Sequence, residues 1–277
     1  NPGAESGNGS VPPFHHQPPC EANMTFPFKL KPYAHQLEEF NFSRSLEGRG
    51  YWWEMGCGKT KPTIETAAYL YDGGEIRGLV VLAPNTVHVN WTLDEIPDHM
   101  PDFVAERMKV MTWFTAKAHN KGTQREFAEL LQHDGLSVLV MSYPAIMTQL
   151  GAKAVKAMFD SRRCMYVADE SSFIKSPGAA RTKRVLASSK YAPYRRVLNG
   201  TPVDNSPFDI FSQIKFIRPE IWRDLGIPTF HLFKQYFGIF ERKMNWGTKR
   251  EYDDLVRYRR LDELHDIVDA VGSRYLK

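Results

Sequence analysis

Short runs of apolar and β-branched residues recur along the chain, and segments with helical periodicity separate them. Five runs have the pattern of strands buried on both faces: Gly50–Trp53, Leu79–Ala83, Val138–Met141, Met165–Ala168 and Arg196–Leu198. Residues 60–71 place apolar side chains at the spacing of an amphipathic helix, and residues 124–131 predict a second helix. This alternation of strands and helices favours an α/β domain with a parallel sheet flanked by helices on both faces.

The two ends of the chain depart from this pattern. Residues 1–25 predict a flexible tail or linker, because residues 1–23 hold five prolines, three glycines and only two charges. The tail contains two histidines and Cys20 but no fourth metal ligand, which favours a plain tail over a metal site. Residues 26–277 form the domain. Its last part, 219–277, is aromatic-rich, then charge-dense, and is predicted to be a helical appendage.

Composition sets broad limits on the class of protein. Hydrophobic residues make up 42% and charged residues 25%, as in ordinary globular proteins. No run approaches the roughly 18 apolar residues of a membrane helix. No secretory signal opens the chain, so we expect a soluble protein of the cytoplasm, or of the nucleoid or host cytoplasm if it is viral. Three separated cysteines without a C-x-x-C pair argue against a disulfide framework and a structural zinc site.

One segment carries a strong local charge. The net charge is only +4, but seven basic residues and no acidic one lie between Lys175 and Arg196. Such a run suits a phosphate backbone. A solvated helix face is an equally good explanation from composition alone.

The strongest motif lies between the first predicted strand and the first helix, at Met55-Gly56-Cys57-Gly58-Lys59-Thr60. Glycines let backbone N–H groups curl around phosphate oxygens, and the helix N-terminus adds unpaired donors. Lys59 can reach the β- and γ-phosphates of ATP, and the Thr60 hydroxyl can ligate Mg²⁺. Trp53 occupies the first glycine position of the usual phosphate loop. A chance match is the alternative, but the strand–loop–helix context favours a phosphate site.

A pair of carboxylates follows a later strand. Asp169 and Glu170 come directly after the run Met165–Ala168. Asp169 is predicted to hold the magnesium ion, and Glu170 to orient and polarise the attacking water. An exposed Asp-Glu turn is the alternative. The turn at Asn199, Gly200, Thr201 and Pro202 follows the next strand and is interpreted as a coupling element.

Together these motifs resemble the first RecA-like domain of superfamily-two helicases, and within them the Swi/Snf-type ATPases, especially compact phage and bacterial members. The resemblance runs from Leu30 to Lys277. Leu30-Lys31-Pro32-Tyr33 with Gln36 resembles the glutamine motif, which implies that Gln36 reads the adenine. Asp169-Glu170-Ser171-Ser172 resembles the DEAx box, with Ser172 where many relatives carry histidine. Gly200-Thr201-Pro202 resembles motif III.

The resemblance also implies where nucleic acid binds. Leu79–Pro84 with Asn90-Trp91 and Glu95 resembles motif Ia, and Ser142-Tyr143 resembles motif Ib. The loop at Pro84 and Asn85 would then touch the nucleic-acid backbone. The basic run after the DEAx box adds Arg181, Lys183 and Arg184.

Two features depart from the family pattern. Cys57 stands where leucine is usual, which we expect to be tolerated. Arg274–Lys277 resembles the link that leads to a second RecA-like domain in the family, and the chain stops where that domain should follow. In the family that second domain carries the arginine fingers and half of the nucleic-acid track.

The leading hypothesis is therefore an ATP-dependent DNA helicase or translocase motor that uses ATP and Mg²⁺. Duplex DNA is expected before single-stranded DNA, with RNA as an alternative. A P-loop kinase would carry an arginine-rich lid and lack the Gly-Thr-Pro element and Gln36. A non-catalytic docking module would have lost Lys59 or Glu170, and both are present.

Overall fold

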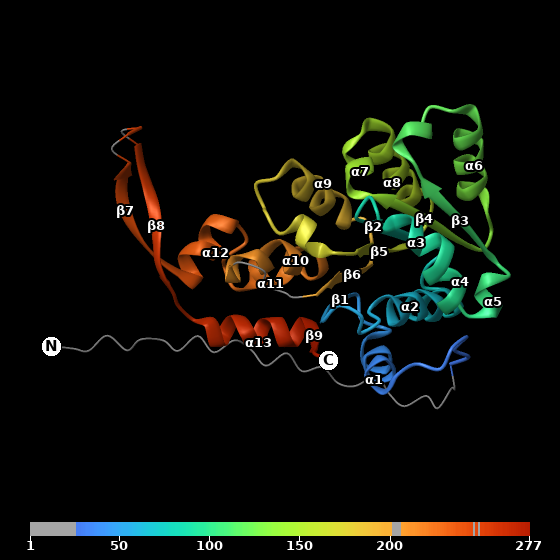
Figure 1. Ribbon diagram of the computed structural model, residues 1–277, viewed down its shortest axis with the longest axis horizontal. Helices are drawn as coiled ribbons and strands as arrows, with labels where there is room; N and C mark the ends of the chain where they lie inside the picture. The colour runs from blue at the N-terminus through green and yellow to red at the C-terminus, as the bar shows by residue number, and fades with distance from the viewer. Residues whose placement is uncertain (1–25, 201–205, 246, 249) are drawn as a thin grey trace.

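The computed structural model describes residues 26–200, 206–245, 247–248 and 250–277, and a parallel sheet forms the centre of this part of the chain (Figure 1). Over these residues the sheet has seven strands in the order β3-β4-β2-β5-β6-β1-β9. All of its pairings are parallel. The strands are β1 Gly48–Trp53, β2 Gly78–Ala83, β3 Met108–Trp113, β4 Leu136–Ser142, β5 Cys164–Ala168, β6 Tyr194–Asn199 and β9 Gly272–Tyr275.

Helices cover both faces of the sheet, as the sequence predicts. The first face carries α1 Ala34–Ser43, α2 Thr60–Asp72, α3 His88–Asn90, a π-helical turn Trp91–Glu95, α4 Ile96–His99 and α5 Asp102–Ala105. The second carries α6 Lys121–Gln132, α7 Tyr143–Met147, α8 Gln149–Ser161, α9 Ala180–Ser189, α10 Ile210–Ile217, α11 Pro219–Asp224, α12 Phe230–Phe237 and α13 Leu261–Val271. Within the described ranges, no helix is both long and apolar enough to cross a membrane.

Successive side chains of the strands alternate between the two cores. In β2, Leu79, Val81 and Ala83 pack into one core, while Val80 and Leu82 pack into the other. Because both of its faces are covered, β2 contains no polar side chain, and this explains why it reads as an apolar run in the sequence.

The predicted elements of the sheet are confirmed, and two strands were missed. The five predicted strands are β1, β2, β4, β5 and β6, and the two predicted helices are α2 and part of α6. The missed strand β3 lies at one edge of the sheet and is half-buried, so its apolar signal is weak. The missed strand β9 has only 4 residues, and two of them are Gly272 and Ser273.

The prediction of a helical appendage over residues 219–277 is wrong in two respects. The charge-dense stretch forms an antiparallel hairpin, β7 Gly238–Asn245 and β8 Arg250–Tyr258. Its strands are largely exposed on both faces, so they lack the alternation that marks a half-buried strand. The last helix of this stretch, α13, ends at Val271, and the chain then joins the central sheet as β9 beside β1 instead of remaining in the appendage.

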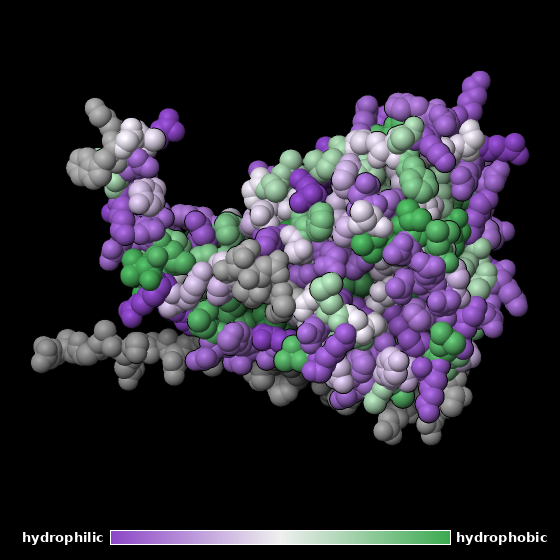
Figure 2. Space-filling view, viewed as in Figure 1, coloured by the Kyte–Doolittle hydropathy of each residue, from purple (hydrophilic) through white to green (hydrophobic). Residues whose placement is uncertain are grey.

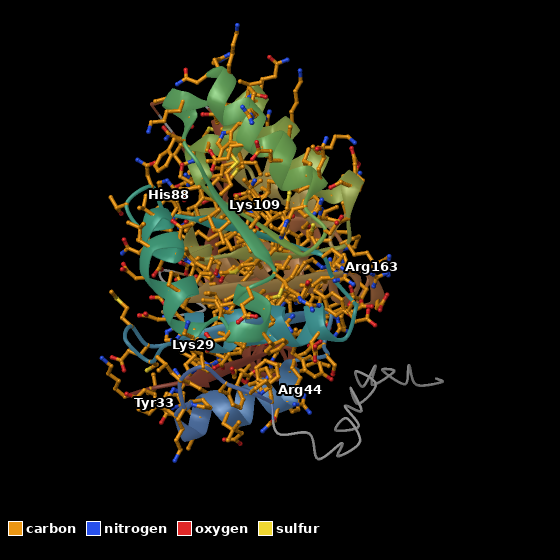
Figure 3. The ribbon with its side chains drawn as sticks, turned by 90° about the vertical axis from the view of Figure 1, so that its right-hand side faces the viewer. Lys29, Tyr33, Arg44, His88, Lys109 and Arg163 are labelled. Carbon is orange, nitrogen blue, oxygen red and sulfur yellow. The ribbon has the colours of Figure 1, made fainter. Side chains whose placement is uncertain are left out.

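The strand order brings three loops together. Strands β5, β6 and β1 are neighbours and run parallel, so the loops that follow them meet at one edge of the sheet. These are the loops that hold the Gly-Lys-Thr motif, the Asp-Glu pair and Gly200. Figure 3 shows the two edges from the side: His88, which follows β2, and Arg163, which precedes β5, lie on opposite sides of the molecule. Ligands of open parallel sheets bind at the carboxyl edge.

Candidate nucleotide-binding site

The loop after β1 has the backbone of a phosphate cradle. Gly56 and Gly58 have φ angles of 80° and 70°, a conformation that favours glycine. The loop ends at Lys59, and Thr60 begins α2. The Lys59 ammonium donates a hydrogen bond to the carbonyl oxygen of Trp53 at 2.9 Å, which keeps it at the loop. The loop therefore offers N–H groups and a cation next to a helix N-terminus.

Two side chains of helix α1 form hydrogen bonds to the backbone of this loop. The side-chain amide of Gln36 donates to the carbonyl oxygen of Gly58 at 3.1 Å and accepts from the backbone N–H of Tyr33 at 2.9 Å. The His35 ring nitrogen Nε2 lies 2.9 Å from the carbonyl oxygen of Cys57. A Cβ atom at position 58 would come within 2.4 Å of the Gln36 amide nitrogen. Gly58 is therefore required both by its φ angle and by the approach of Gln36.

These contacts bear on Gln36 as the predicted reader of adenine. Its side chain is only 2% exposed, and it already bonds to two backbone groups. What the structure describes is a clamp on the loop, and adenine recognition by Gln36 stays a prediction. Neighbouring Tyr33 is 72% exposed and lies on the His88 side of the molecule (Figure 3).

Two unusual residues in the loop have structural roles. Trp53, at the usual first glycine position, is the last residue of β1, pairs with Tyr275 of β9 and donates from its indole N–H to Ser273 at 2.8 Å. Cys57 is buried with the apolar residues around α2, as a small hydrophobe would be. Met55, in contrast, is 73% exposed at the loop's surface.

Asp169 is held by four bonds at the end of β5. One carboxylate oxygen accepts the indole N–H of Trp91 at 2.8 Å, and the other accepts the backbone N–H of Glu170 at 2.9 Å. Its backbone N–H donates to Leu82 in β2, and its carbonyl oxygen accepts the Tyr143 hydroxyl at 2.7 Å. The carboxylate is thus oriented by Trp91 from the loop after β2, and the backbone of Asp169 is held by Tyr143, which follows β4.

Burial and neighbouring charges set the ionisation of this carboxylate. Burial raises the pKa of Asp169 to about 6, against the opposing effect of the Trp91 hydrogen bond. The positive charge of Lys59 also lowers this pKa, as expected for charges that share a site. Burial and, secondly, the Asp169 charge raise the pKa of Glu95, which lies in the π-helical turn that begins with Trp91.

Glu170 has a strained backbone. Its φ and ψ angles are 48° and 59°, in the left-handed region that residues with a Cβ rarely adopt. Such strain costs of order 1–3 kcal/mol and concentrates at functional sites. The side chain is half-buried and directly precedes the turn Ser171–Ile174. The observed conformation therefore agrees with a functional position for Glu170.

A buried polar network behind the acidic pair was missed by the sequence reasoning. The side-chain oxygen of Gln213 in α10 accepts from the Ser171 hydroxyl at 2.6 Å and from the Trp52 indole at 3.1 Å. This amide therefore links the turn after Glu170 to strand β1. The signal in the sequence is a buried-face glutamine between Phe211 and Ile214 in the largely apolar helix Ile210–Ile217.

The coupling element lies beside the phosphate loop. A Cβ built on Gly200 would lie 3.7 Å from the Met55 side chain. Gly200 follows β6, whose residue Asn199 pairs with Trp52. Thr201 and Pro202 lie outside the described residues, so their predicted part in coupling is not addressed by the geometry.

The predicted nucleic-acid residues divide into exposed and buried ones. Asn85 is exposed, but the side chain of Pro84 is buried and its carbonyl oxygen caps α3. Lys183 and Arg184 are exposed on α9. Arg181 is half-buried; its guanidinium lies 5.0 Å from the centroid of the Phe173 ring, and its Nε donates to the Phe173 carbonyl oxygen.

The basic run does not form one surface. Arg195 and Arg196 are buried within β6, where they donate to backbone carbonyl oxygens of neighbouring segments. The Arg196 guanidinium bonds to the segment before β1, and the Arg195 guanidinium bonds to α10. The phosphate-binding interpretation is therefore restricted to the part of the run that precedes β6.

The donor set fits magnesium bound with nucleotide. In the described part of the chain, no group of three or more His, Cys, Asp or Glu side chains could hold a metal ion by itself. Mg²⁺ is typically held by one or two protein oxygens together with substrate phosphates. The Thr60 hydroxyl and the Asp169 carboxylate are oxygen donors of this type.

Comparison with known proteins agrees with this arrangement. The family described as SNF2-related domain matches residues 52–270. The chain is 32% identical over 232 residues to the chromatin-remodeling ATPase INO80 of Sclerotinia sclerotiorum, covering 81% of this chain and 12% of that protein. It is 27% identical over 235 residues to helicase SWR1 of Saccharomyces cerevisiae, covering 81% and 14%. It is 26% identical over 227 residues to the DNA annealing helicase and endonuclease ZRANB3 of Mus musculus, covering 81% and 19%.

The fold has a counterpart among solved structures. The Sulfolobus solfataricus SWI2/SNF2 ATPase core in complex with dsDNA superposes with a TM-score of 0.62 at 19% identity. The match covers 91% of this chain and 46% of that chain. The predicted RecA-like fold is confirmed, and the chain spans less than a fifth of the curated relatives named above.

Proposed function

Because this chain belongs to the family of SNF2-related domains, we propose that it forms the first motor lobe of an ATP-dependent DNA translocase. The observation that carries the proposal is the edge of the sheet where β5, β6 and β1 end. There the phosphate loop, the Asp169-Glu170 pair and Gly200 lie together. A kinase fold would need the same loop, but it would not need an Asp169 held at its carboxylate by the loop after β2 and at its backbone by the residue after β4.

In this proposal each group of the site has one role in hydrolysis. Backbone N–H groups of the Gly56–Lys59 loop bind the phosphates, and Lys59 contributes a positive charge. Thr60 and Asp169 hold Mg²⁺, which supplies charge that neutralises the phosphate oxygens. Glu170 orients the attacking water and accepts its proton.

Glu170 is well placed for this role because its backbone is constrained. The Asp169 carboxylate accepts the Glu170 N–H, and Ser171 is tied to Gln213. The residue between these two anchors has little freedom to rotate. A fixed carboxylate lowers the entropic barrier for positioning water.

We also propose that a second lobe completes the site. An arginine from such a lobe would stabilise the charge of the transferred phosphoryl group, a contribution worth about 10³–10⁵ in rate where it occurs. The solved SWI2/SNF2 core is more than twice as long as the part matched here, which leaves room for that lobe. DNA would lie across the exposed loop at Asn85 and the α9 residues Lys183 and Arg184.

Steady-state phosphate release tests the proposal. We expect this chain to bind ATP and hydrolyse it slowly, and a two-lobe protein that contains it to be stimulated by duplex DNA. Release of inorganic phosphate without an acceptor distinguishes a translocase from a P-loop kinase. If the two-lobe protein bound ATP but showed no DNA-stimulated phosphate release, the translocase assignment would be wrong and a docking module would be favoured.

A further inference from the structure

The hairpin β7–β8 projects away from the body of the molecule, on the side opposite α6 (Figure 1). Its two strands pair with each other and, over the described residues, with no other strand. Figure 2 shows mostly hydrophilic residues along the projecting part and apolar residues at its base. An isolated two-stranded ribbon is marginally stable in water. The proposed ATP site does not use this hairpin, so we expect a function in binding another molecule.

The base of the hairpin is firmly attached. Phe240 in β7 stacks on Phe208 at 6.2 Å between ring centroids, and Tyr258 in β8 meets the same ring edge-on at 5.2 Å. The hydroxyl groups of Tyr258 and Ser206 are 3.1 Å apart and share a hydrogen bond. The ribbon is therefore a fixed arm that presents its outer end to solvent.

The outer end of the hairpin carries basic residues that suit binding to nucleic acid. From Arg242 to Arg250 the sequence contains four basic residues and no acidic one. Of the acidic side chains, Glu241 and Asp254 lie opposite each other nearer the base, whereas Asp253 faces Arg242 and Glu251 faces Met244 farther out. Both Asp253 and Glu251 form exposed ion pairs with Arg242. Beyond Met244 and Glu251, the described residues of the tip include Arg250 and no acid.

Strand register places complementary side chains on one face of this end. Lys243 lies opposite Tyr252, and Asn245 lies opposite Arg250. Directly opposed residues share a face of an antiparallel pair, so two cations, an amide and an aromatic ring occupy the same face. All four residues are exposed. Lys243 pairs with Asp254, and that is an exposed ion pair with little stability of its own.

The other face of the ribbon forms a polar hollow with α12. A cavity of about 280 Å³ lies at this junction, lined by His231, Lys234, Gln235, Phe240, Arg242 and Asp253. Its charged lining contains two permanent cations and one carboxylate. Such a lining accepts a phosphate group better than it accepts a cation.

We propose that the β7–β8 hairpin is a DNA-binding arm that lies in the major groove of the duplex, with Lys243 and Arg250 against the phosphate backbone. An antiparallel two-stranded ribbon fits the width of about 12 Å of the major groove. Contacts from exposed cations to phosphates carry no sequence information, as a motor that moves along DNA requires. This inference rests on the proposed translocase function and extends it to a surface outside the ATP site.

The attachment of the arm suggests how its contact reaches the motor. Tyr258 bonds to Ser206, which lies six residues beyond Gly200 beside the phosphate loop. A load on the arm would therefore act on Ser206, at the start of the turn Pro207–Asp209 that leads into α10. Helix α10 carries Gln213, which bonds to Ser171 behind the acidic pair, so described residues connect the arm to the ATP site.

Salt-dependent DNA binding tests the arm. The variant Lys243→Gln/Arg250→Gln is compared with a matched control, Lys121→Gln/Arg125→Gln, on α6 at the opposite end of the molecule (Figure 1). Binding of a fluorescent duplex of random sequence is measured by anisotropy from 50 to 300 mM salt. Each phosphate contact adds about 0.9 to the slope of log K against log salt.

The expected outcome follows from that slope. Loss of two contacts should reduce it by about 1.8 and weaken binding at 0.1 M salt by up to ~60-fold. The control variant should bind like the wild type, and both variants should bind ATP normally, which shows that they are folded. A photo-crosslinker at Tyr252 should label the duplex, whereas one at Gln132, exposed at the C-terminal end of α6, should not.

Two results would refute the proposal that the hairpin binds DNA. In the first, the hairpin variant binds DNA like the wild type with the same salt slope, and Tyr252 gives no crosslink. That result would assign the ribbon to a protein partner or to the second lobe and leave the translocase proposal intact. In the second, neither the wild-type chain nor the two-lobe protein binds duplex DNA. That result would refute both the DNA-binding hairpin and the DNA-translocase function.

Discussion

The hydrogen bond between Trp91 and Asp169 offers the sharpest test of how this site is built. Trp91→Phe keeps an aromatic ring at a position that is 1% exposed and removes only the indole N–H and one ring. Asp169 is 8% exposed, so water cannot freely replace the lost donor. A hydrogen bond to a charged group contributes about 1.5–3 kcal/mol, and a neutral one about 0.5–1.5 kcal/mol.

A double-mutant cycle isolates this bond from the lost packing. Trp91→Phe, Asp169→Ala and the double variant are unfolded with urea in the absence of Mg²⁺. At pH 8 Asp169 is ionised, because its pKa is about 6. We expect a coupling free energy of about 1.5–3 kcal/mol there. At pH 5 the carboxyl is protonated, and the coupling should fall to about 0.5–1.5 kcal/mol.

The functional readout uses the same variant. If the indole orients the carboxylate for Mg²⁺, Trp91→Phe should weaken Mg²⁺-dependent nucleotide binding about 10-fold or more, since 1.4 kcal/mol is a factor of ten. Binding of nucleotide without Mg²⁺ should be unchanged. Additive unfolding energies at both pH values, within about 0.5 kcal/mol, would refute the reasoning.

Three further predictions address the loop, the water-activating carboxylate and a buried acid. Lys59→Ala should abolish nucleotide binding or turnover in a fluorescent-nucleotide assay, and an affinity equal to the wild type would remove Lys59 from the site. Glu170→Gln should bind ATP but release no phosphate in the two-lobe protein, whereas Glu170→Gly should also gain about 1 kcal/mol of stability against urea by relieving the left-handed φ angle. Burial raises the pKa of Glu65 from 4.5 to about 7 despite its bond to Lys61. Between pH 4.5 and 7 the folded state therefore keeps a proton on Glu65 that the unfolded state has lost. The free energy of unfolding should fall by at most about 3 kcal/mol as pH rises over this range, and Glu65→Gln should reduce that dependence on pH.

The sequence predicted the parts of the site whose chemistry is local. The phosphate loop is six consecutive residues between a strand and a helix, and glycine is required at position 58 for reasons that any such loop shares. The acidic pair follows a buried strand directly. In both cases the strand directly before the motif places its functional residues at the carboxyl edge of the sheet.

The contacts that orient those residues could not be read in the same way. Trp91 and Asp169 are 78 positions apart, and Trp52 and Gln213 are 161 apart. Their contacts depend on strand order and on the twist of the sheet. The same reason explains the basic run: composition gave Arg196 the same weight as Lys183, but only the position of β6 inside the sheet decides that Arg196 is buried.

Asp169 is the point where the nucleotide site meets the two loops that face the proposed DNA. The loop after β2 presents Asn85 to solvent and reaches Trp91 within two turns, and Trp91 bonds to the carboxylate. The strand β4 ends at Ser142, and the next residue, Tyr143, bonds to the Asp169 carbonyl oxygen. Coupling between two ligands is typically worth 1–3 kcal/mol, which is the size of one such buried bond to a charged group. With the roles proposed above, a shift of either loop on DNA would be sufficient to change how Asp169 holds Mg²⁺, without any movement of the phosphate loop itself.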